Sequence, residues 1–233
     1  MRFDDQRKIM VEEQLIPRGI LNQQIIEAFL KVPREIFVSE KYKEFAYIDR
    51  PLSIGHDQTI SQPYMVALMM TLLEIKETDI VLEIGTGGGY QTALLAELAH
   101  EVYTIERIEE LLLSAKKTLK TLDYKNVYFK IGDGCLGWVN ALPQVSAFDK
   151  IIVSAASPDT PLMLLKQLKT GGKLIVPQGQ KSFVQDLMVY EKRAAPPTKL
   201  TEWGGKAGEE QYEIVSRKHG ECRFVPLIGE GAH

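Results

Sequence analysis

The sequence is poor in cysteine and has no excess of positive charge. Only Cys135 and Cys222 occur among 233 residues, so a disulfide-dense fold is excluded, and no Cys-x-x-Cys pair or Cys/His cluster suggests zinc. Lys and Arg total 28, against 31 for Asp and Glu, which gives a net charge of -3. This balance does not favour a nucleic-acid-binding protein. We therefore expect neither a metal nor a nucleic-acid partner.

Long apolar runs are also missing. The longest, such as 65–73, are shorter than the roughly 18 residues that a membrane-spanning helix needs. The first residues, MRFDDQ, lack the apolar core of a signal peptide. With 45% hydrophobic and 25% charged residues, the composition is that of an ordinary globular domain. We expect a cytoplasmic protein, monomeric and without membrane contact.

From residue 79 the pattern is one of short apolar runs that alternate with amphipathic stretches. Five such runs predict buried strands at 80–84, 102–105, 127–131, 150–153 and 173–176. Near-continuous apolar strands separated by helices are typical of a parallel sheet covered on both faces. Segments 186–192 and 223–228 are expected to close the sheet with antiparallel pairing. The prediction is a doubly wound α/β fold with a mostly parallel, Rossmann-like sheet of about seven strands.

The part before residue 79 has a helical pattern. It predicts helices over 7–15, 22–30 and 62–73, with Asn22 and Ser61 as N-caps and a polar loop over 47–60. We expect residues 1–78 to form a helical N-terminal extension that contributes a substrate loop, and 79–233 to form the cofactor-binding domain, the two packed as one unit.

A glycine-rich segment, EIGTGGGY over 83–90, lies between the first predicted strand and the next helix. Glycines there let the backbone turn sharply and approach a ligand, and the helix N-terminus favours an anionic group. Glu106 ends the second strand, where a carboxylate can accept hydrogen bonds from both ribose hydroxyls of a nucleoside. The pattern indicates a cofactor with an adenosine moiety, although glycine-rich turns also occur without a ligand.

The loop distinguishes between cofactors. A dinucleotide loop requires Gly-x-Gly-x-x-Gly or Ala, and here Tyr90 occupies the third position. The spacing is instead Glu-x-Gly-x-Gly-x-Gly, which resembles the S-adenosylmethionine loop of class I methyltransferases. Asp133 and Gly134 follow the third strand, where a carboxylate can accept from an adenine amine or simply cap a turn. Both alternatives remain open from spacing alone.

Further segments resemble one methyltransferase family. TISQP over 59–63 matches a Thr-Ile-Ser-x-Pro motif, and RFVPL over 223–227 matches a second family segment. With the glycine loop and the segment 168–177, they resemble protein-L-isoaspartate (D-aspartate) O-methyltransferases over nearly the whole chain. Some relatives have His where this chain has Tyr64.

The resemblance implies methyl transfer from S-adenosylmethionine, with S-adenosylhomocysteine as product, to isoaspartyl residues in damaged proteins and peptides. Ser61 matches the family's active-site serine, although from the sequence alone it equally fits a helix cap. The expected cofactor-binding residues are Glu83, Gly85, Thr86, Gly87, Gly89, Glu106, Arg107, Asp133 and Gly134. The expected substrate-binding residues are Thr59, Ile60, Ser61 and Val225. The pattern around Val225 by itself favours a plain closing strand, and the peptide contact is what the resemblance implies.

Three alternative functions compete with this one. A nicotinamide oxidoreductase is disfavoured by Tyr90. A nucleic-acid base methyltransferase is disfavoured by SAASP over 154–158, where amino-methylating enzymes have an Asn/Asp-Pro-Pro-Tyr/Phe motif. A binding module that retains the pocket without catalysis is compatible with the sequence.

Overall fold

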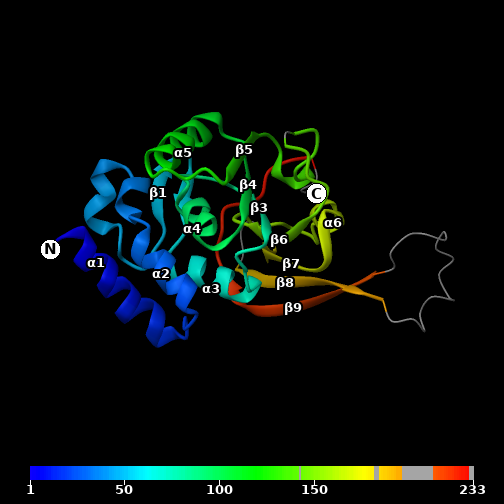
Figure 1. Ribbon diagram of the computed structural model, residues 1–233, viewed down its shortest axis with the longest axis horizontal. Helices are drawn as coiled ribbons and strands as arrows, with labels where there is room; N and C mark the ends of the chain where they lie inside the picture. Colours follow the sequence, from blue (N-terminus) through cyan, green and yellow to red (C-terminus); the bar gives the residue numbers. More distant parts are fainter. Residues whose placement is uncertain (142, 181–183, 196–211, 231–233) are drawn as a thin grey trace.

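A mixed sheet of seven strands forms the centre of the computed structural model, which describes residues 1–141, 143–180, 184–195 and 212–230 (Figure 1). Its strands are β3 (Ile80–Ile84), β4 (Glu101–Glu106), β5 (Val127–Ile131), β6 (Phe148–Val153), β7 (Leu168–Gln178), β8 (Gln185–Ala194) and β9 (Tyr212–Cys222). The helices α4 (Tyr90–Leu98), α5 (Glu109–Thr121) and α6 (Leu162–Lys166) connect them. The prediction of an α/β fold with about seven strands is confirmed.

The order of the strands in space is β5-β4-β3-β6-β7-β8-β9. Strands β3 to β7 pair in parallel, whereas β8 is antiparallel to both of its neighbours. The chain moves outward from β3 in one direction through β4 and β5, and in the other through β6. Ligands of doubly wound sheets bind at such a switch point, outside the carboxyl ends of the strands.

Side chains on each strand alternate between two hydrophobic clusters, one on each face of the sheet. On β3, Val81 packs with α3 (Pro63–Leu73) and α4, whereas Leu82 and Ile84 pack on the other face with α6 and Trp138. Glu83 therefore faces α4, on the side of Val81. This alternation places a carboxylate inside the protein directly beneath the first turn of α4.

The N-terminal extension shares the core of the sheet. Met10, Val11 and Leu15 are buried in the same cluster as Val81 and Val102. The first helix, α1 (Phe3–Ile9), starts earlier than predicted and continues through a π-helical turn over 10–15. It then passes into a 3-10 turn over 16–18. The division of the chain at residue 78 stays a prediction.

Asn22 caps the second helix, α2 (Gln23–Lys31), as predicted, because its side chain accepts a hydrogen bond of 3.2 Å from the backbone N–H of Ile25. Two 3-10 turns, over 34–37 and 40–45, then lead toward the sheet. They place Arg34 in the interior.

The segment 47–60 was predicted to be a loop throughout. It contains instead a two-stranded antiparallel hairpin of β1 (Leu52–Gly55) and β2 (Gln58–Ile60). His56 and Asp57 form its turn with φ values of 52° and 57°. Two consecutive left-handed residues are typical of a type I′ turn, which usually contains Asn or Gly. Because His and Asp occupy these two positions, the Asn-Gly pattern that identifies a hairpin is missing from the sequence.

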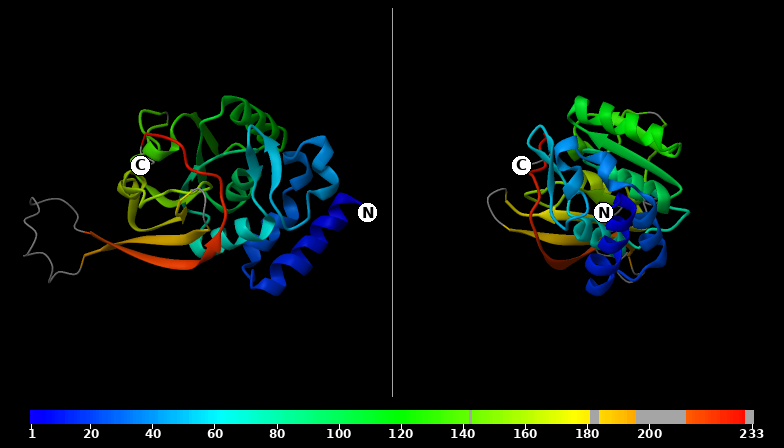
Figure 2. Two further views of the ribbon diagram at one scale, coloured as in Figure 1. Left: turned by 180° about the vertical axis from the view of Figure 1, so that it is seen from behind. Right: turned by 90° about the vertical axis from the view of Figure 1, so that its left-hand side faces the viewer.

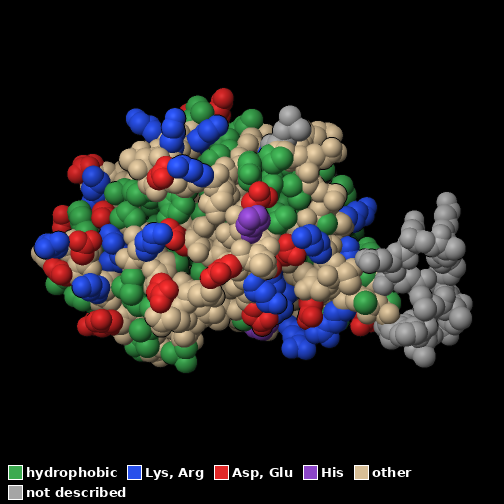
Figure 3. Space-filling view, in the orientation of Figure 1, with side chains coloured by type: hydrophobic (Ala, Val, Ile, Leu, Met, Phe, Trp, Pro, Cys, Tyr) green, Lys and Arg blue, Asp and Glu red, His purple; other side chains and the backbone are tan. Residues whose placement is uncertain are grey.

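The closing strands were predicted only in part. β8 covers the predicted segment 186–192, but the last strand is β9 and not 223–228. β9 is an edge strand whose exposed residues include Arg217 and Lys218, and Figure 3 shows basic side chains gathered over this part of the sheet. Charged edge strands resist pairing with other chains and lack the apolar alternation that identifies a buried strand.

The segment after β9 runs back across the sheet (Figure 2). It makes one isolated parallel bridge, between Pro226 and Ala156. Its apolar residues were mistaken for a strand because they pack over the carboxyl edge of the sheet.

Within the described ranges, no helix is long and apolar enough to cross a bilayer. In the same part of the chain, no group of three or more His, Cys, Asp or Glu side chains is arranged to hold a metal ion. Cys135 and Cys222 are both buried.

Candidate active site

The glycine loop forms the floor of a cleft at the carboxyl ends of β3 and β4. The N–H groups of Gly85 and Thr86 both donate to the carbonyl of Ile105, at 2.8 and 3.3 Å, which folds the loop back onto β4. Gly87 and Gly89 have φ values of 52° and 91°, a region that side chains rarely adopt. A Cβ atom on Gly89 would also lie 3.0 Å from the Cβ of Ala115. The sequence is therefore glycine-rich here because the backbone is left-handed and α5 is close.

The carboxylate of Glu106 faces this loop from the end of β4. One of its oxygens accepts from the N–H of Gly87 at 2.9 Å, and the other accepts from Arg107 at 2.8 Å and Ile108 at 3.0 Å. Three backbone donors thus fix the carboxylate in a single orientation at the wall of the cleft, which Arg107 also lines. A carboxylate oxygen accepts more than one hydrogen bond, so Glu106 retains capacity for ligand hydroxyls.

Glu83 lies beneath the cleft and does not line it. Its side chain is completely buried and accepts hydrogen bonds from the hydroxyls of Thr92 and Thr104, at 2.6 and 2.7 Å, and from the amide of Gln91 at 3.0 Å. Burial raises the pKa of Glu83 to about 7 in spite of these donors. The structure therefore gives Glu83 a supporting position under the loop, and direct contact with a cofactor stays a prediction.

Gly134 lines the cleft, and Asp133 does not. The carboxylate of Asp133 accepts from the N–H of Cys135 at 2.8 Å and from that of Glu230 at 2.7 Å. Asp133 therefore caps the 3-10 turn over 134–136, which was one of the two alternatives for this residue. Its second hydrogen bond holds the C-terminal segment in place. A Cβ on Gly134 would lie 2.3 Å from Ile84, so the close packing of this turn requires glycine. Contact between Asp133 and an adenine amine stays a prediction.

Ser61 is not the N-cap of α3, contrary to the prediction. The helix begins at Pro63 after Gln62, and the carboxylate of Asp49 accepts from the backbone N–H of Tyr64 at 2.9 Å. Asp49 also pairs with Arg18 at 2.5 Å. A residue distant in sequence thus performs the capping, which the local pattern did not reveal.

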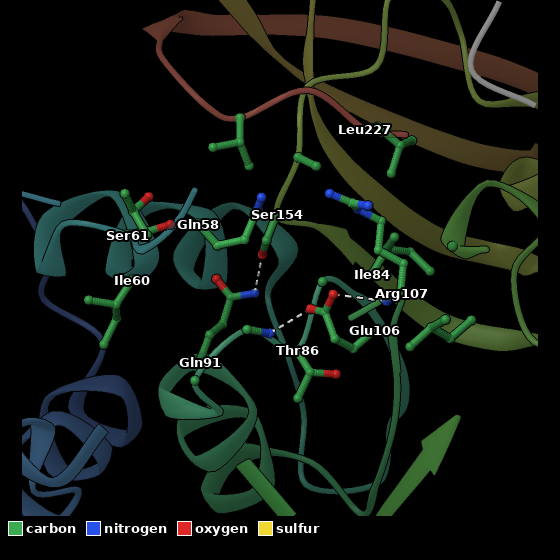
Figure 4. Close-up of a pocket in the computed structure, with 18 of the residues that line it drawn as sticks. Gln58, Ile60, Ser61, Ile84, Thr86, Gln91, Glu106, Arg107, Ser154 and Leu227 are labelled. Atoms are coloured by element: carbon green, nitrogen blue, oxygen red, sulfur yellow. Dashed lines mark hydrogen bonds between the residues drawn. The ribbon is translucent and has the colours of Figure 1, made fainter. Parts of the chain in front are cut away.

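The hydroxyl of Ser61 is consequently unengaged, since it makes no hydrogen bond within the described part of the chain. The backbone carbonyl of Ser61 is fixed instead, by a hydrogen bond of 2.8 Å from the guanidinium of Arg34. Thr59, Ile60 and Ser61 all line the cleft. In Figure 4 Ser61 and Glu106 lie on opposite sides of it, with Gln91 and Ser154 between them.

Gln91 and Ser154 are site residues whose contacts the sequence analysis missed. The amide of Gln91 donates to the hydroxyl of Ser154 at 2.7 Å (Figure 4). It also donates to Glu83. Ser154 follows β6, and Gln91 stands in the first turn of α4. The signal was available, because both residues adjoin the carboxyl ends of neighbouring strands.

A second cavity, here called the groove, adjoins the cleft and has a volume of about 880 Å³. Thr59, Ser61, Ser154 and Val225 line both the cleft and the groove. Tyr64 lines the groove, and its ring lies 3.3 Å from the guanidinium carbon of Arg18. Cys222 also lines it, and burial raises the pKa of this thiol to about 11, so the thiol is not a nucleophile near neutral pH.

Val225 lies in the C-terminal segment between the two cavities. Its carbonyl accepts from the N–H of Ala156 at 2.7 Å, and the N–H of Leu227 donates to the carbonyl of Ala156 at 2.8 Å. The N–H of Val225 has no partner within the described residues. The segment thus contains a backbone donor without a partner, on a residue that lines both cavities together with Ser61.

The cleft fits a cofactor with an adenosine moiety and a polar tail. Glu106 provides ribose acceptors, Ile84, Ile105 and Leu227 provide apolar surface, and the left-handed backbone at Gly85 and Gly87 leaves room that side chains would occupy. Such a combination of apolar walls with a few fixed polar groups is typical of a small-molecule site.

The fold and this cleft define a class I methyltransferase. The family description "Protein-L-isoaspartate(D-aspartate) O-methyltransferase (PCMT)" matches residues 5–231. The chain belongs to this family.

Individual relatives agree with this assignment. A protein-L-isoaspartate O-methyltransferase of Syntrophus aciditrophicus is 48% identical over 229 residues, which cover 98% of this chain and 96% of the relative. The corresponding protein of Dictyoglomus turgidum is 49% identical over 229 residues, 98% of this chain and 94% of the relative.

Two solved structures share the fold of this chain. A protein-L-isoaspartate O-methyltransferase structure aligns with a TM-score of 0.79 and 27% identity over 99% of this chain and 67% of the other. A Plasmodium falciparum structure described as a complex with S-adenosyl-L-homocysteine aligns with a TM-score of 0.74 and 24% identity, covering 95% of this chain and 98% of the other. The latter supports the fold alone.

Proposed function

We propose that this protein transfers a methyl group from S-adenosylmethionine to the free α-carboxylate of L-isoaspartyl residues in damaged proteins and peptides. The observation that carries the proposal is the junction of the two cavities at Thr59, Ser61, Ser154 and Val225. A donor in the cleft and a peptide in the groove would meet there.

The chemistry makes few demands on the protein. When bound, S-adenosylmethionine supplies a methyl group on a sulfonium, which is an activated leaving group. A carboxylate has a pKa near 4 and is ionised at neutral pH, so the substrate needs no general base. What the protein must do is hold one carboxylate oxygen about 3–3.5 Å from the methyl carbon and in line with the breaking bond.

Donors at the junction meet that requirement. The unengaged Ser61 hydroxyl and the unpaired Val225 N–H both lie where the cleft and the groove meet. Hydrogen bonds to an ionised acceptor are stronger than neutral ones. We assign Ser61 as the catalytic residue, and Thr59, Ile60 and Val225 as further residues of the peptide site.

The cofactor side is assigned from the cleft. Glu106 would accept from the ribose hydroxyls, with Arg107 beside it, and the loop residues Gly85, Thr86, Gly87 and Gly89 would lie against the polar tail. Glu83 supports the loop from below. For Asp133 and Gly134 we retain the adenine end of the site.

Methylation starts a repair that needs no further residue of the enzyme. The methyl ester is attacked more readily than the ionised acid, so the adjacent backbone nitrogen displaces methanol and closes a succinimide. Water then opens the succinimide, partly to normal aspartyl. We further propose that the protein acts as a cytoplasmic monomer without a nucleic-acid partner.

The test is incubation with labelled S-adenosylmethionine and matched peptides that contain Asp or isoAsp at one position. Base-labile label is expected only in the isoAsp peptide. An isoAsp peptide whose α-carboxylate is a carboxamide is the control and should stay unlabelled. Equal labelling of the Asp and isoAsp peptides, or no labelling, would overturn the proposal.

A further inference from the structure

One completely buried cation has no counter-ion. The side chain of Arg34 is 0% exposed, and it donates hydrogen bonds to two backbone carbonyls, those of Ala46 at 2.7 Å and Ser61 at 2.8 Å. Its Nη1 atom has no partner. No carboxylate forms an ion pair with it in the described part of the chain. Such an arrangement is unusual, because buried charges are normally paired.

The surroundings do not neutralise this charge. Burial lowers the pKa of Arg34, while Tyr90, Tyr47 and Asp49 act in the opposite direction, and a guanidinium stays protonated in proteins. The charge of Asp49 is already shared by Arg18, by the N–H of Tyr64 and by the Gln62 amide at 3.3 Å. Arg34 therefore retains an uncompensated positive charge.

Tyr90 holds the guanidinium from the cofactor side. The guanidinium carbon of Arg34 lies 4.7 Å from the centroid of the Tyr90 ring, and Phe29 and Phe37 pack against that ring with centroid distances of 6.2 and 5.6 Å. The bulky residue that distinguishes this loop from a dinucleotide loop thus forms a platform for Arg34. The platform links the end of the glycine loop to the backbone of Ser61.

We propose that Arg34 is a positioning residue that fixes Ser61 through its carbonyl and whose buried positive charge favours an ionised carboxylate at the Ser61 hydroxyl. The proposal rests on the proposed function. A charge inside a low-dielectric region acts on a nearby ligand more strongly than a solvated one. The isoaspartyl α-carboxylate would thus supply the negative charge that the protein itself lacks at this position, and an uncharged analogue would not.

The experiment measures the binding of two peptides to the protein saturated with S-adenosylhomocysteine. One carries the free isoaspartyl α-carboxylate and the other its carboxamide. For the unchanged protein we expect the acid to bind about tenfold more tightly than the amide, the range of a charge-assisted hydrogen bond. In Arg34→Met the ratio of the two dissociation constants should fall to about twofold or less, because the charge is absent.

Two further variants separate charge from structure. Arg34→Lys keeps the charge but not the forked geometry, so it should retain most of the acid-to-amide ratio while methyl transfer slows. Arg7→Met is the matched control, since Arg7 is another largely buried arginine but pairs with Glu35. Its ratio should equal that of the unchanged protein. If Arg34→Met does not fold, Arg34→Gln takes its place, since it is uncharged but keeps amide donors for the two carbonyls. A purely structural role predicts an unchanged acid-to-amide ratio in this variant, whereas the proposed role of the charge predicts a fall to about twofold or less.

An acid-to-amide ratio that is the same in Arg34→Met as in the unchanged protein overturns the inference. So does a ratio near one in Arg34→Lys. Both results leave the proposed function intact, provided that the unchanged protein methylates the isoAsp peptide. If the unchanged protein does not methylate it, the proposed function itself fails.

Discussion

Two completely buried ionisable side chains, Glu83 and Arg34, support opposite sides of the candidate active site. They differ in kind. Glu83 lies under the glycine loop, the side of the cleft that we assign to the cofactor and call the cofactor wall. It accepts hydrogen bonds from Thr92, Thr104 and Gln91. Arg34 lies behind Ser61, on the side of the cleft that we assign to the peptide and call the substrate wall, and it donates to two backbone carbonyls. A carboxyl group in the interior can take up a proton and lose its charge, whereas a guanidinium cannot. The cofactor wall therefore responds to pH, and the substrate wall keeps a permanent charge.

The largest effect is expected at Glu83, whose buried carboxyl group should make the free energy of unfolding depend on pH. Burial raises its pKa from 4.5 to about 7. Between these values the folded protein holds a proton that the unfolded chain has released, so raising the pH through this window lowers the free energy of unfolding, by on the order of 3 kcal/mol in total. In Glu83→Gln this loss should be absent.

The measurement is denaturant unfolding of both proteins at pH 5 and pH 8. Relative to the unchanged protein, Glu83→Gln should gain stability at the higher pH. Glu110→Gln, an exposed substitution on α5, should follow the unchanged protein at both values. Parallel pH profiles for Glu83→Gln and the unchanged protein would mean that Glu83 does not carry a raised pKa.

A smaller effect, on the affinity for S-adenosylhomocysteine, is expected at Glu106, which lines the cleft and faces the glycine loop. Glu106→Ala removes the acceptor of three backbone N–H groups together with the proposed ribose acceptor. The dissociation constant for S-adenosylhomocysteine should rise about 30-fold, and Glu106→Gln, which keeps one acceptor oxygen, should show an intermediate value. Calorimetry measures both, with the exposed Glu110→Ala as control. Unchanged affinity in Glu106→Ala would remove Glu106 from the cofactor site.

These contacts also show how far sequence reasoning reaches. The strands β3 and β4, the turn at the glycine loop and the position of Glu106 at the end of β4 were predicted correctly, because their geometry is set by residues between 80 and 106, in contact along adjacent strands. The contact of Glu106 with a cofactor stays a prediction. The hydrogen-bond partners of Glu83 also lie within this interval. Whether Glu83 is buried beneath the cleft or lines it, however, depends on which face of the sheet α4 covers. The sequence pattern could not decide that question.

The substrate wall was predicted less well, for a physical reason. Asp49 replaces Ser61 as the cap of α3, and Arg34 holds Ser61 from 27 positions away in sequence. Such contacts depend on how separate loops pack. The hairpin over 52–60 and the last strand, β9, were missed because their turn and edge residues are polar and lack the usual patterns.

The smallest effect is expected at Asp49, where the groups are partly exposed. Asp49→Ala removes both the cap and the ion pair with Arg18, and should lower the free energy of unfolding by about 1–2 kcal/mol. Asp49→Asn keeps an acceptor for the Tyr64 N–H and should lose less. High salt should narrow the difference between Asp49→Asn and the unchanged protein, because exposed pairs are screened. If Asp49→Asn is as costly as Asp49→Ala, capping is not the main contribution.

The central claim is that Ser61 acts on the substrate carboxylate at the junction of cleft and groove. The most direct test is Ser61→Ala, with single-turnover methyl transfer to an isoAsp peptide measured beside the affinity for S-adenosylhomocysteine, and with the hairpin variant Ser53→Ala as control. Transfer should slow about 10- to 100-fold, while cofactor affinity stays within about twofold. An unchanged transfer rate, or a loss of affinity that matches the loss of rate, would contradict the claim.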